Sequence, residues 1–388
     1  MIPASIRSVG PETGSYDFVV IGGGIAGLAT AYHLTTTGAD TVLVVERNTL
    51  GSGATGFSSG GVRQQFSTLE EIRLSIRALD FWRNAEVTLA SPCQFEETGY
   101  LFVTGRPELL VRLSEAADLQ RRLGAGPIEV LDAGNVARVA PWLSAEGLVG
   151  GTWTPHDGRI VPSDSVNALA SAARAGGARI RQGMGVDAID RLAGSFRLRG
   201  PEIDLEAGTV IVAAGLGTTQ LLKALGHDVA VRPWTIHYAY TAPALTAYHI
   251  PNTIDLDLGM SVKREGPGLK LGILDEGSSP DSRPEEMLEQ FFHAAAVRAP
   301  SLLDSEIIGT MTAAADLSVD GHPYAGRLED GLWVFAGFGG HGTMHGPVLA
   351  EDLVRCIRTA DEGGLALFDP KRTGPPAHAE WLVASRKA

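Results

Sequence analysis

The chain is poor in cysteine, in charge and in long apolar runs, and each shortage excludes a class of protein. It has 2 Cys in 388 residues, Cys93 and Cys356, which lie far apart. This argues against a disulfide framework and against a cysteine metal site. Charged residues make up 20% and hydrophobic residues 44% of the chain, which is typical of a folded globular protein. No apolar run approaches the roughly 20 residues that a membrane-spanning helix needs.

Positive charge is also scarce. The chain has 32 Lys and Arg against 45 Asp and Glu, which gives a net charge of -13. Such a charge opposes binding to nucleic acid and to anionic lipids, so we expect no nucleic acid and no membrane as partner. Residues 1–15 contain no apolar core of the kind found in signal peptides, which predicts a cytoplasmic protein.

The first motif is a strand, a glycine turn and a helix close to the N-terminus. The apolar run 18–21 is followed by Gly22-x-Gly24-x-x-Gly27 and by a helical pattern. Such glycines allow a sharp turn and let the backbone approach a pyrophosphate at the helix N-terminus. A second apolar run ends at Glu46, whose carboxylate could accept hydrogen bonds from a ribose. The unit predicts a dinucleotide site, for either NAD or FAD.

Two further glycine-rich segments extend this prediction. Residues 51–56 could offer N–H groups and hydroxyls to a pyrophosphate or a flavin ring, or form a flexible surface loop. Near the C-terminus a strand-like run leads into the turn 337–342, which would stabilise a reduced, anionic flavin. His341 could contact the flavin or the substrate, or make only a structural hydrogen bond. His341 and His345 have helical metal spacing, but no third ligand is evident, so we expect no metal.

These segments, together with residues 213–215 and 320–323, resemble those of the D-amino-acid-oxidase-like flavoenzymes. That family includes sarcosine oxidases, glycine oxidases and the β subunits of sarcosine oxidase and proline dehydrogenase complexes. The resemblance implies an α/β fold with a Rossmann-type FAD-binding domain (GR2-like) and a second, antiparallel-sheet substrate domain. The expected FAD-binding domain is discontinuous and comprises residues 1–90, 146–226 and 310–388. The expected substrate domain comprises residues 91–145 and 227–309.

The motifs and the resemblance together predict which residues hold FAD. They are Gly22, Gly24, Ile25, Ala26, Gly27, Glu46, Arg47, Ser52, Gly53, Ala54, Thr55, Ser59, Gly60, Gly61, Val186, Ala214, Gly215, Gly337, Gly339, Gly340, His341, Gly342 and Thr343. Family members with covalent flavin attach it through a cysteine or a histidine. Here Ala313-Ala314-Ala315 and Gly56-Phe57-Ser58 occupy those regions, so we expect non-covalent FAD.

The resemblance also implies catalytic roles for Lys270, Arg63 and His341. Residues 268–272 are similar to the strand of monomeric sarcosine oxidases whose lysine activates dioxygen; the alternative is a strand lysine that reaches solvent. Arg63 falls at the arginine that pairs with the substrate carboxylate, and the alternative is a surface or interdomain ion pair.

The predicted substrate pocket consists of Arg63, His237, Tyr238 and Met344. His237 and Tyr238 lie on an expected strand, and they could instead be ordinary strand residues. Met344 replaces a lysine that assists carboxylate binding in monomeric sarcosine oxidases. The substrate therefore need not be sarcosine.

The sequence thus predicts an FAD-dependent amine or amino-acid oxidase. Hydride would pass from the carbon next to a primary or secondary amine to flavin N5 and leave an imine. O2 would then reoxidise the flavin and give H2O2. The first alternative is a dehydrogenase that passes electrons to a partner subunit. The others are a flavin-binding protein without activity and a nicotinamide dehydrogenase, which would leave the C-terminal glycine turn without a task.

Overall fold

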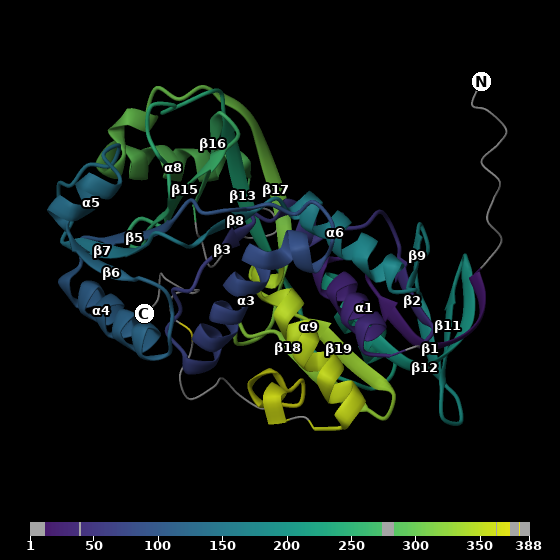
Figure 1. The fold of residues 1–388 in the computed structure, drawn as a ribbon. Coiled ribbons are helices and arrows are strands. Elements are labelled where there is room, and N and C mark those ends of the chain that lie inside the picture. The colour runs from purple at the N-terminus through teal and green to yellow at the C-terminus, as the bar shows by residue number, and fades with distance from the viewer. Residues whose placement is uncertain (1–11, 39, 274–282, 362, 373–379, 381–388) are drawn as a thin grey trace, which may run out of the picture.

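The strand of the N-terminal motif lies inside the first of two large sheets, and the helix after the glycine turn packs against that sheet (Figure 1). The computed structural model describes residues 12–38, 40–273, 283–361, 363–372 and 380. Residues 1–11, which belong to the stretch predicted to lack a signal peptide, lie outside the described part of the chain. Within the described residues, no helix combines the length and the apolar character needed to cross a membrane.

The first sheet has parallel central strands and antiparallel strands around them. Strand β1 pairs in parallel with β2 and β12, and these pair in parallel with β9 and β19 respectively. The strands are β1 (Glu12–Ile21), β2 (Val42–Glu46), β9 (Arg179–Gln182), β10 (Ala188–Arg191), β11 (Phe196–Gly200), β12 (Ile203–Val212), β18 (Tyr324–Glu329) and β19 (Leu332–Ala336). Val20 and Val44 are buried on one face and Val19 and Val45 on the other. Burial on both faces is typical of a parallel sheet.

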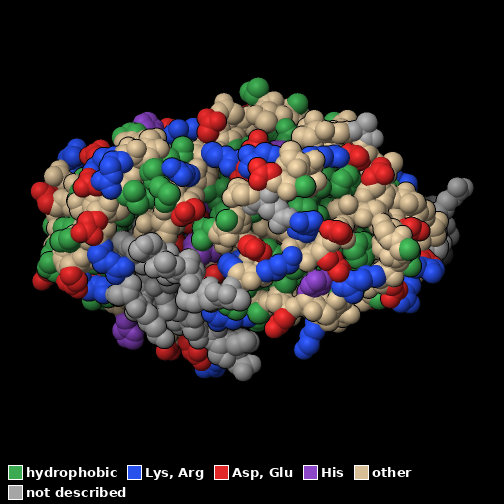
Figure 2. Space-filling view, turned by 90° about the horizontal axis from the view of Figure 1, so that it is seen from below, with side chains coloured by type: hydrophobic (Ala, Val, Ile, Leu, Met, Phe, Trp, Pro, Cys, Tyr) green, Lys and Arg blue, Asp and Glu red, His purple; other side chains and the backbone are tan. Residues whose placement is uncertain are grey.

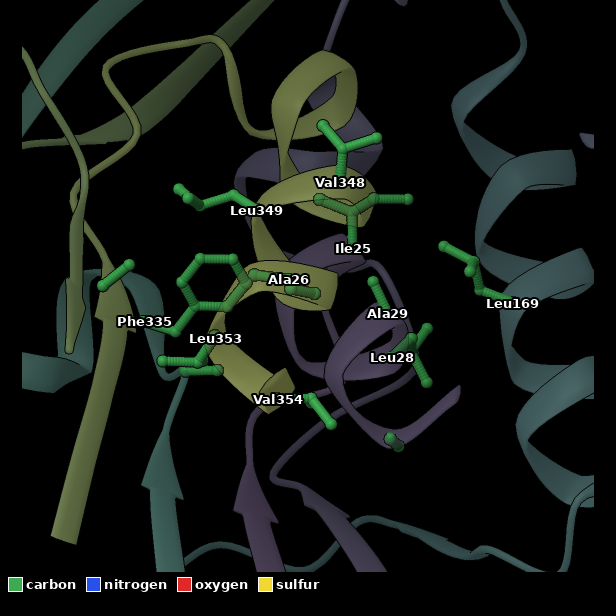
Figure 3. Packing of buried hydrophobic residues seen from close by; sticks show 14 of the residues in the cluster. Ile25, Ala26, Leu28, Ala29, Leu169, Phe335, Val348, Leu349, Leu353 and Val354 are labelled. Atoms are coloured by element: carbon green, nitrogen blue, oxygen red, sulfur yellow. The ribbon is translucent and has the colours of Figure 1, made fainter. Parts of the chain in front are cut away.

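Helices cover one face of this sheet and fix the direction of the first helix. They are α1 (Ile25–Thr37), α3 (Leu69–Thr88), α6 (Pro162–Ala175) and α9 (Gly342–Thr359). Helix α1 packs between α6 and α9 through Leu28, Leu169 and Val348 (Figure 3). Because α1 begins directly after the glycine turn, this packing determines where its N-terminus points.

The second sheet is antiparallel except for one pair of strands, β5 and β14. In spatial order its strands are β17 (Ile307–Leu317), β13 (Arg232–Thr241), β16 (Gly268–Ile273), β15 (Met260–Glu265), β14 (Asn252–Asp255), β5 (Tyr100–Thr104), β7 (Gly150–Thr154) and β6 (Glu129–Asp132). Val262 and Leu271 pack against Phe291 of α8 (Pro284–Arg298). Residues alternate along a strand, so Lys263 and Lys270 lie on the face away from α8.

A small three-stranded sheet and the remaining helices complete the described part of the chain. They are β3 (Gly61–Val62), β4 (Phe95–Glu96), β8 (Gly158–Ile160), α2 (Ala54–Phe57), α4 (Pro107–Arg122), α5 (Ala133–Val139), α7 (Thr218–Lys223) and the 3-10 helices η1 (Gly215–Gly217), η2 (Pro300–Leu302) and η3 (Gly363–Phe368). The expected domain boundaries at residues 146 and 310 fall beside β7 and within β17, which both pair in the second sheet. The division into two discontinuous domains stays a proposal.

Charged side chains mix on the molecular surface. Figure 2 shows Lys and Arg interspersed with Asp and Glu on the face that it presents, without a continuous basic area. Nucleic acids and anionic lipids bind to continuous basic areas. This face offers neither ligand such an area.

Candidate functional site

A cavity of about 530 Å³ lies where the parallel strands of the first sheet end and the second sheet faces them. Ile21, Val45 and Ala213, at the carboxyl ends of β1, β2 and β12, line it from one side. Tyr238 of β13 and Lys263 of β15 line it from the second sheet. Open α/β sheets bind ligands at this edge, so the fold itself determines where the site lies.

The glycine turn after β1 permits backbone contacts that no other residue allows. Gly22 has φ +118°, and a Cβ there would lie 2.2 Å from the carbonyl oxygen of Ala213. A Cβ at Gly27 would lie 2.0 Å from the carbonyl oxygen of Gly22. Only glycine fits at both positions. Ile25 and Ala26, in the first turn of α1, line the cavity, so the positive end of the helix dipole faces it.

Glu46 lies beside this turn with its carboxylate fixed in place. Its Oε2 accepts a hydrogen bond from the N–H of Gly23 at 2.7 Å, and its Oε1 accepts one from the N–H of Asn48 at 2.8 Å. Each oxygen retains a lone pair for a ribose hydroxyl. Thr55 Oγ1 accepts a hydrogen bond from the N–H of Ile25 at 3.1 Å, which ties the second glycine segment to α1. The close-packed glycines and this acceptor fit the adenosine diphosphate part of a dinucleotide.

Most residues predicted to bind FAD line the cavity. They are Gly22, Gly24, Ile25, Ala26, Glu46, Arg47, Ser52, Gly53, Ala54, Thr55, Ser59, Gly61, Val186, Ala214, Gly215, Gly339, Gly340, His341, Gly342 and Thr343. Gly27, Gly60 and Gly337 do not line it, because each supports a turn behind the wall. A Cβ at Gly60 would lie 2.0 Å from the carbonyl oxygen of Ile160, and Gly337, at φ +80°, donates its N–H to Asp316 Oδ2 at 2.7 Å.

Sequence reasoning missed wall residues that carry no motif. They include Asn48, Tyr100, Met184, Gly185, Leu216, Gly217, Trp234, Ile236, Ser261, Lys263 and Phe338. Several come from β13 and β15, which meet the first sheet only in the folded chain. Alternation along these strands indicates which residues share a face, but not which face meets the cavity.

Arg63 lines the cavity and is 5% exposed. Its guanidinium carbon lies 4.1 Å from the centre of the Phe66 ring, and its Nη1 donates to the carbonyl oxygen of Gln65. The backbone N–H of Arg63 donates to Met344 Sδ at 3.2 Å. Within the described part of the chain Arg63 forms no ion pair, so the alternative of a surface or interdomain ion pair has no partner there.

His341 contacts Arg63 and is uncharged. Its Nε2 lies 3.4 Å from Arg63 Nη2. Burial, followed by the charge of Arg63, lowers the pKa of His341 well below its usual value. His345, one turn further along α9, also has a lowered pKa, about 4, chiefly because it is buried. The glycine turn therefore brings a neutral imidazole, not a second cation, beside Arg63 in the cavity.

Lys270 is buried but does not line the cavity. It is 4% exposed, which contradicts the alternative of a lysine that reaches solvent. Its Nζ lies 4.1 Å from the centre of the Tyr238 ring and 3.4 Å from the carbonyl oxygens of Phe57 and Ser58. The ring of Tyr238, which does line the cavity, stands beside it. Burial, followed by the charge of Lys263, lowers the pKa of Lys270 to about 8.

His237 does not line the cavity either. Trp234, Ile236 and Tyr238 of β13 face the cavity, so His237 points to the opposite face of the strand. There its Nδ1 makes a 2.9 Å hydrogen bond with Thr312 Oγ1. His237 therefore lies outside the cavity, contrary to the prediction that it belongs to the substrate pocket. Neighbouring strand residues point to opposite faces, and the sequence does not show whether His237 or Tyr238 points inward.

Comparison with known proteins agrees with this geometry. Residues 17–355 match the family model described as FAD dependent oxidoreductase. The chain belongs to this family, and FAD is its cofactor. The resemblance to D-amino-acid-oxidase-like enzymes and the predicted fold class are confirmed, and a nicotinamide dehydrogenase is contradicted.

Curated relatives are longer than this chain. It is 26% identical over 370 residues to 4-methylaminobutanoate oxidase (formaldehyde-forming) of Paenarthrobacter nicotinovorans, which covers 89% of this chain and 44% of that protein. It is 24% identical to mitochondrial dimethylglycine dehydrogenase of Mus musculus, with 95% of this chain and 45% of the relative covered. The chain thus spans a little less than half the length of these relatives.

Solved structures share the fold over almost their whole length. L-proline dehydrogenase from P. horikoshii superposes with a TM-score of 0.86 at 24% identity, covering 93% of this chain and 98% of that chain. Glycine oxidase from Geobacillus kaustophilus gives a TM-score of 0.82 at 22% identity, covering 93% and 99%. At these identities the likeness shows the fold alone.

Proposed function

We propose that this protein oxidises a carboxylate-bearing amine. A hydride leaves the carbon next to a primary or secondary amine, and water hydrolyses the resulting imine to a carbonyl compound and an amine. Bound FAD supplies the two-electron acceptor for this step. The observation that carries the proposal is the guanidinium of Arg63, buried in the cavity wall without an ion pair among the described residues. A planar, bidentate cation in this position suits a substrate carboxylate.

The relatives support the same class of substrate. Their names refer to oxidation or dehydrogenation of 4-methylaminobutanoate, dimethylglycine and sarcosine. Each of these molecules combines an N-methylated amine with one carboxylate. For the present chain, a substrate of this class is part of the proposal.

The charges around Arg63 favour the reactive form of the amine. Arg63 and Lys263 line the cavity, and His341 is neutral. Nearby cations disfavour a protonated amine, so the bound amine gives up its proton to solvent more readily. A neutral amine can release a hydride without a general base, and we assign no such base. FAD is proposed to be held non-covalently, because Ala313–Ala315 and Gly56–Ser58 offer no cysteine or histidine for attachment.

O2 is the proposed electron acceptor, and Lys270 the residue that promotes its reduction to H2O2. A buried ammonium stabilises the negative charge that develops on O2. A second candidate, a dehydrogenase that passes electrons to a partner protein, is favoured by one observation. Lys270 lies beside the ring of Tyr238 and is not part of the cavity wall, so the access of O2 to its charge is restricted.

Rapid mixing separates the two acceptors. The holoenzyme is reduced with an amine without oxygen and then mixed with O2, for the wild type, for Lys270→Met and for Lys223→Met as a surface control. An oxidase gives fast reoxidation and stoichiometric H2O2 in the wild type and the control, and slow reoxidation in Lys270→Met. Equal reoxidation in all three proteins removes Lys270 from this role. Slow reoxidation of the wild type, with fast transfer to a quinone or a second flavoprotein, establishes the dehydrogenase.

A further inference from the structure

A second buried cation lines the cavity. Lys263 is 8% exposed, and its Nζ donates a 2.5 Å hydrogen bond to Ser59 Oγ. The chain has few lysines, yet two of them, Lys263 and Lys270, lie directly opposite each other on neighbouring strands. Strand alternation turns both away from the core beneath the sheet. Of the two, Lys263 is the one that faces the cavity.

Lys263 and Arg63 lie close enough for one small ligand to reach both. Arg63 lies 5.7 Å and Lys263 Nζ 5.9 Å from the centre of the same ring, that of Tyr100. Burial, followed by the charge of Arg63, lowers the pKa of Lys263 to about 8. The positive charges of Arg63 and Lys263 therefore border the same part of the cavity.

No carboxylate of the described residues forms an ion pair with Arg63 or Lys263, although Glu71 and Asp157 interact with the charge of Arg63 and Glu265 with that of Lys263 over longer distances. Two acids line the cavity, and Glu46 lies at the dinucleotide end, bonded to Gly23 and Asn48. Asp316 accepts the N–H of Gly337. Glu265, two residues beyond Lys263, pairs with Arg159 at 3.3 Å. Lys263 keeps two N–H donors beyond the one given to Ser59, and a buried ammonium is stable only when such donors are satisfied.

We propose that the substrate is a secondary amine with a carboxylate on each of its two arms, one held by Arg63 and the other by Lys263. This inference rests on the proposed function and makes it more specific. The nitrogen lies between the two cations, and the carbon that loses the hydride belongs to one arm. A substrate with one carboxylate leaves the ammonium of Lys263 unpaired and binds more weakly.

Two ligands that differ only in the second carboxylate test the proposal without any turnover. Thiodiacetate and methylthioacetate carry sulfur in place of the amine nitrogen, so neither can form an imine. Each is titrated into oxidised holoenzyme while the flavin absorbance is followed. Wild type should bind thiodiacetate at least about tenfold more tightly, because a charge-assisted hydrogen bond contributes that much. Lys263→Met should remove this preference, Lys263→Arg should retain most of it, and Lys270→Met should leave the ratio unchanged.

Kinetics with iminodiacetate and sarcosine give the same comparison for a reacting pair. The ratio of their kcat/KM values should favour iminodiacetate and fall about tenfold or more in Lys263→Met. Equal affinity of the wild type for the two thioethers overturns the inference. An equal loss of affinity for both ligands in Lys263→Met also overturns it and assigns Lys263 to the cofactor or to O2. If thiodiacetate is preferred but no amine is oxidised, the anion site stands and the proposed function fails.

Discussion

Single residues determine the chemistry of the cavity through charge and burial. Arg63, Lys263 and Lys270 are each at most 8% exposed, and they are grouped around the rings of Tyr100 and Tyr238. Burying a cation is unfavourable unless a ligand or a polar group pairs with it. A protein that keeps cations at such positions uses them to bind or stabilise negative charge. In this account Arg63 carries the recognition of the substrate carboxylate.

Replacing Arg63 tests this role. Arg63→Met should raise KM for the carboxylate substrate at least about thirtyfold, because truncating one side of a buried ion pair costs about 2 kcal/mol or more. Arg63→Lys should recover part of the loss, since a lysine keeps the charge without the bidentate geometry. Arg106, which pairs with Asp257 at 2.9 Å outside the cavity, provides the matched control Arg106→Met. A similar KM in Arg63→Met and the control would contradict the role.

The glycine turn is an element whose geometry can be tested directly. A Cβ at Gly27 would meet the carbonyl oxygen of Gly22 at 2.0 Å, so Gly27→Ala must displace α1 from β1. We expect FAD affinity to fall about tenfold or more, as overpacking of this kind costs about 1–3 kcal/mol. Gly309→Ala is the control, because a Cβ there meets no atom within 4 Å. Equal flavin content of the two purified variants would show that the turn tolerates a side chain.

Helix α3 is tied to the C-terminal part of the chain by a buried acid. Glu71 Oε1 lies 2.9 Å from His322 Nδ1, and Glu71 Oε2 lies 3.2 Å from His345 Nδ1. Burial opposes ionisation of both partners in the first pair. Even so, the contacts lower the pKa of Glu71 and raise the pKa of His322. The charged pair is therefore a stabilising link between these elements.

The two shifts predict how stability depends on pH. The raised pKa of His322 contributes stability that is complete below the unfolded value of 6.5 and is lost as pH rises through the folded value. The lowered pKa of Glu71 contributes stability above 4.5 that is lost as pH falls through the folded value. Urea unfolding of Glu71→Gln should show a loss of about 3–5 kcal/mol at pH 5–6 and a smaller loss outside this window. Glu70→Gln, at an exposed neighbour, is the control, and equal stability of both variants would contradict the link.

Local sequence patterns predicted which helices and strands form better than they predicted the residues at which these elements begin and end. The C-terminal glycine segment is the clearest case, since the sequence predicts a turn over residues 337–342. Helix α9 instead begins at Gly342. Gly342 permits a tight contact of the helix with the preceding turn, because a Cβ there would lie 3.3 Å from Phe338. Glycines that permit close packing and glycines that form turns look alike in sequence.

At the scale of the whole molecule, the site depends on how two sheets meet, and local sequence says little about that. The strand-turn-helix motif marks the dinucleotide end, because its residues are neighbours in the chain. The place of Lys263 in the site can be inferred only from the structure, in which β15 pairs with β16 and Lys263 lies opposite Lys270. His237 was placed on the wrong face for the same reason. The resemblance predicted the fold and the cofactor, whereas the far wall of the cavity required the structure.

Anaerobic titration of the purified holoenzyme is the measurement that tests the central claim most directly. The flavin spectrum is followed as N-substituted amino acids and their neutral amides are added without oxygen. Acids with a free carboxylate should bleach the flavin, and the matching amides should do so far less well, because an amide gives the Arg63 guanidinium no negative charge to bind. A flavin that dithionite bleaches but no amine does, or one bleached equally by acid and amide, would contradict the account.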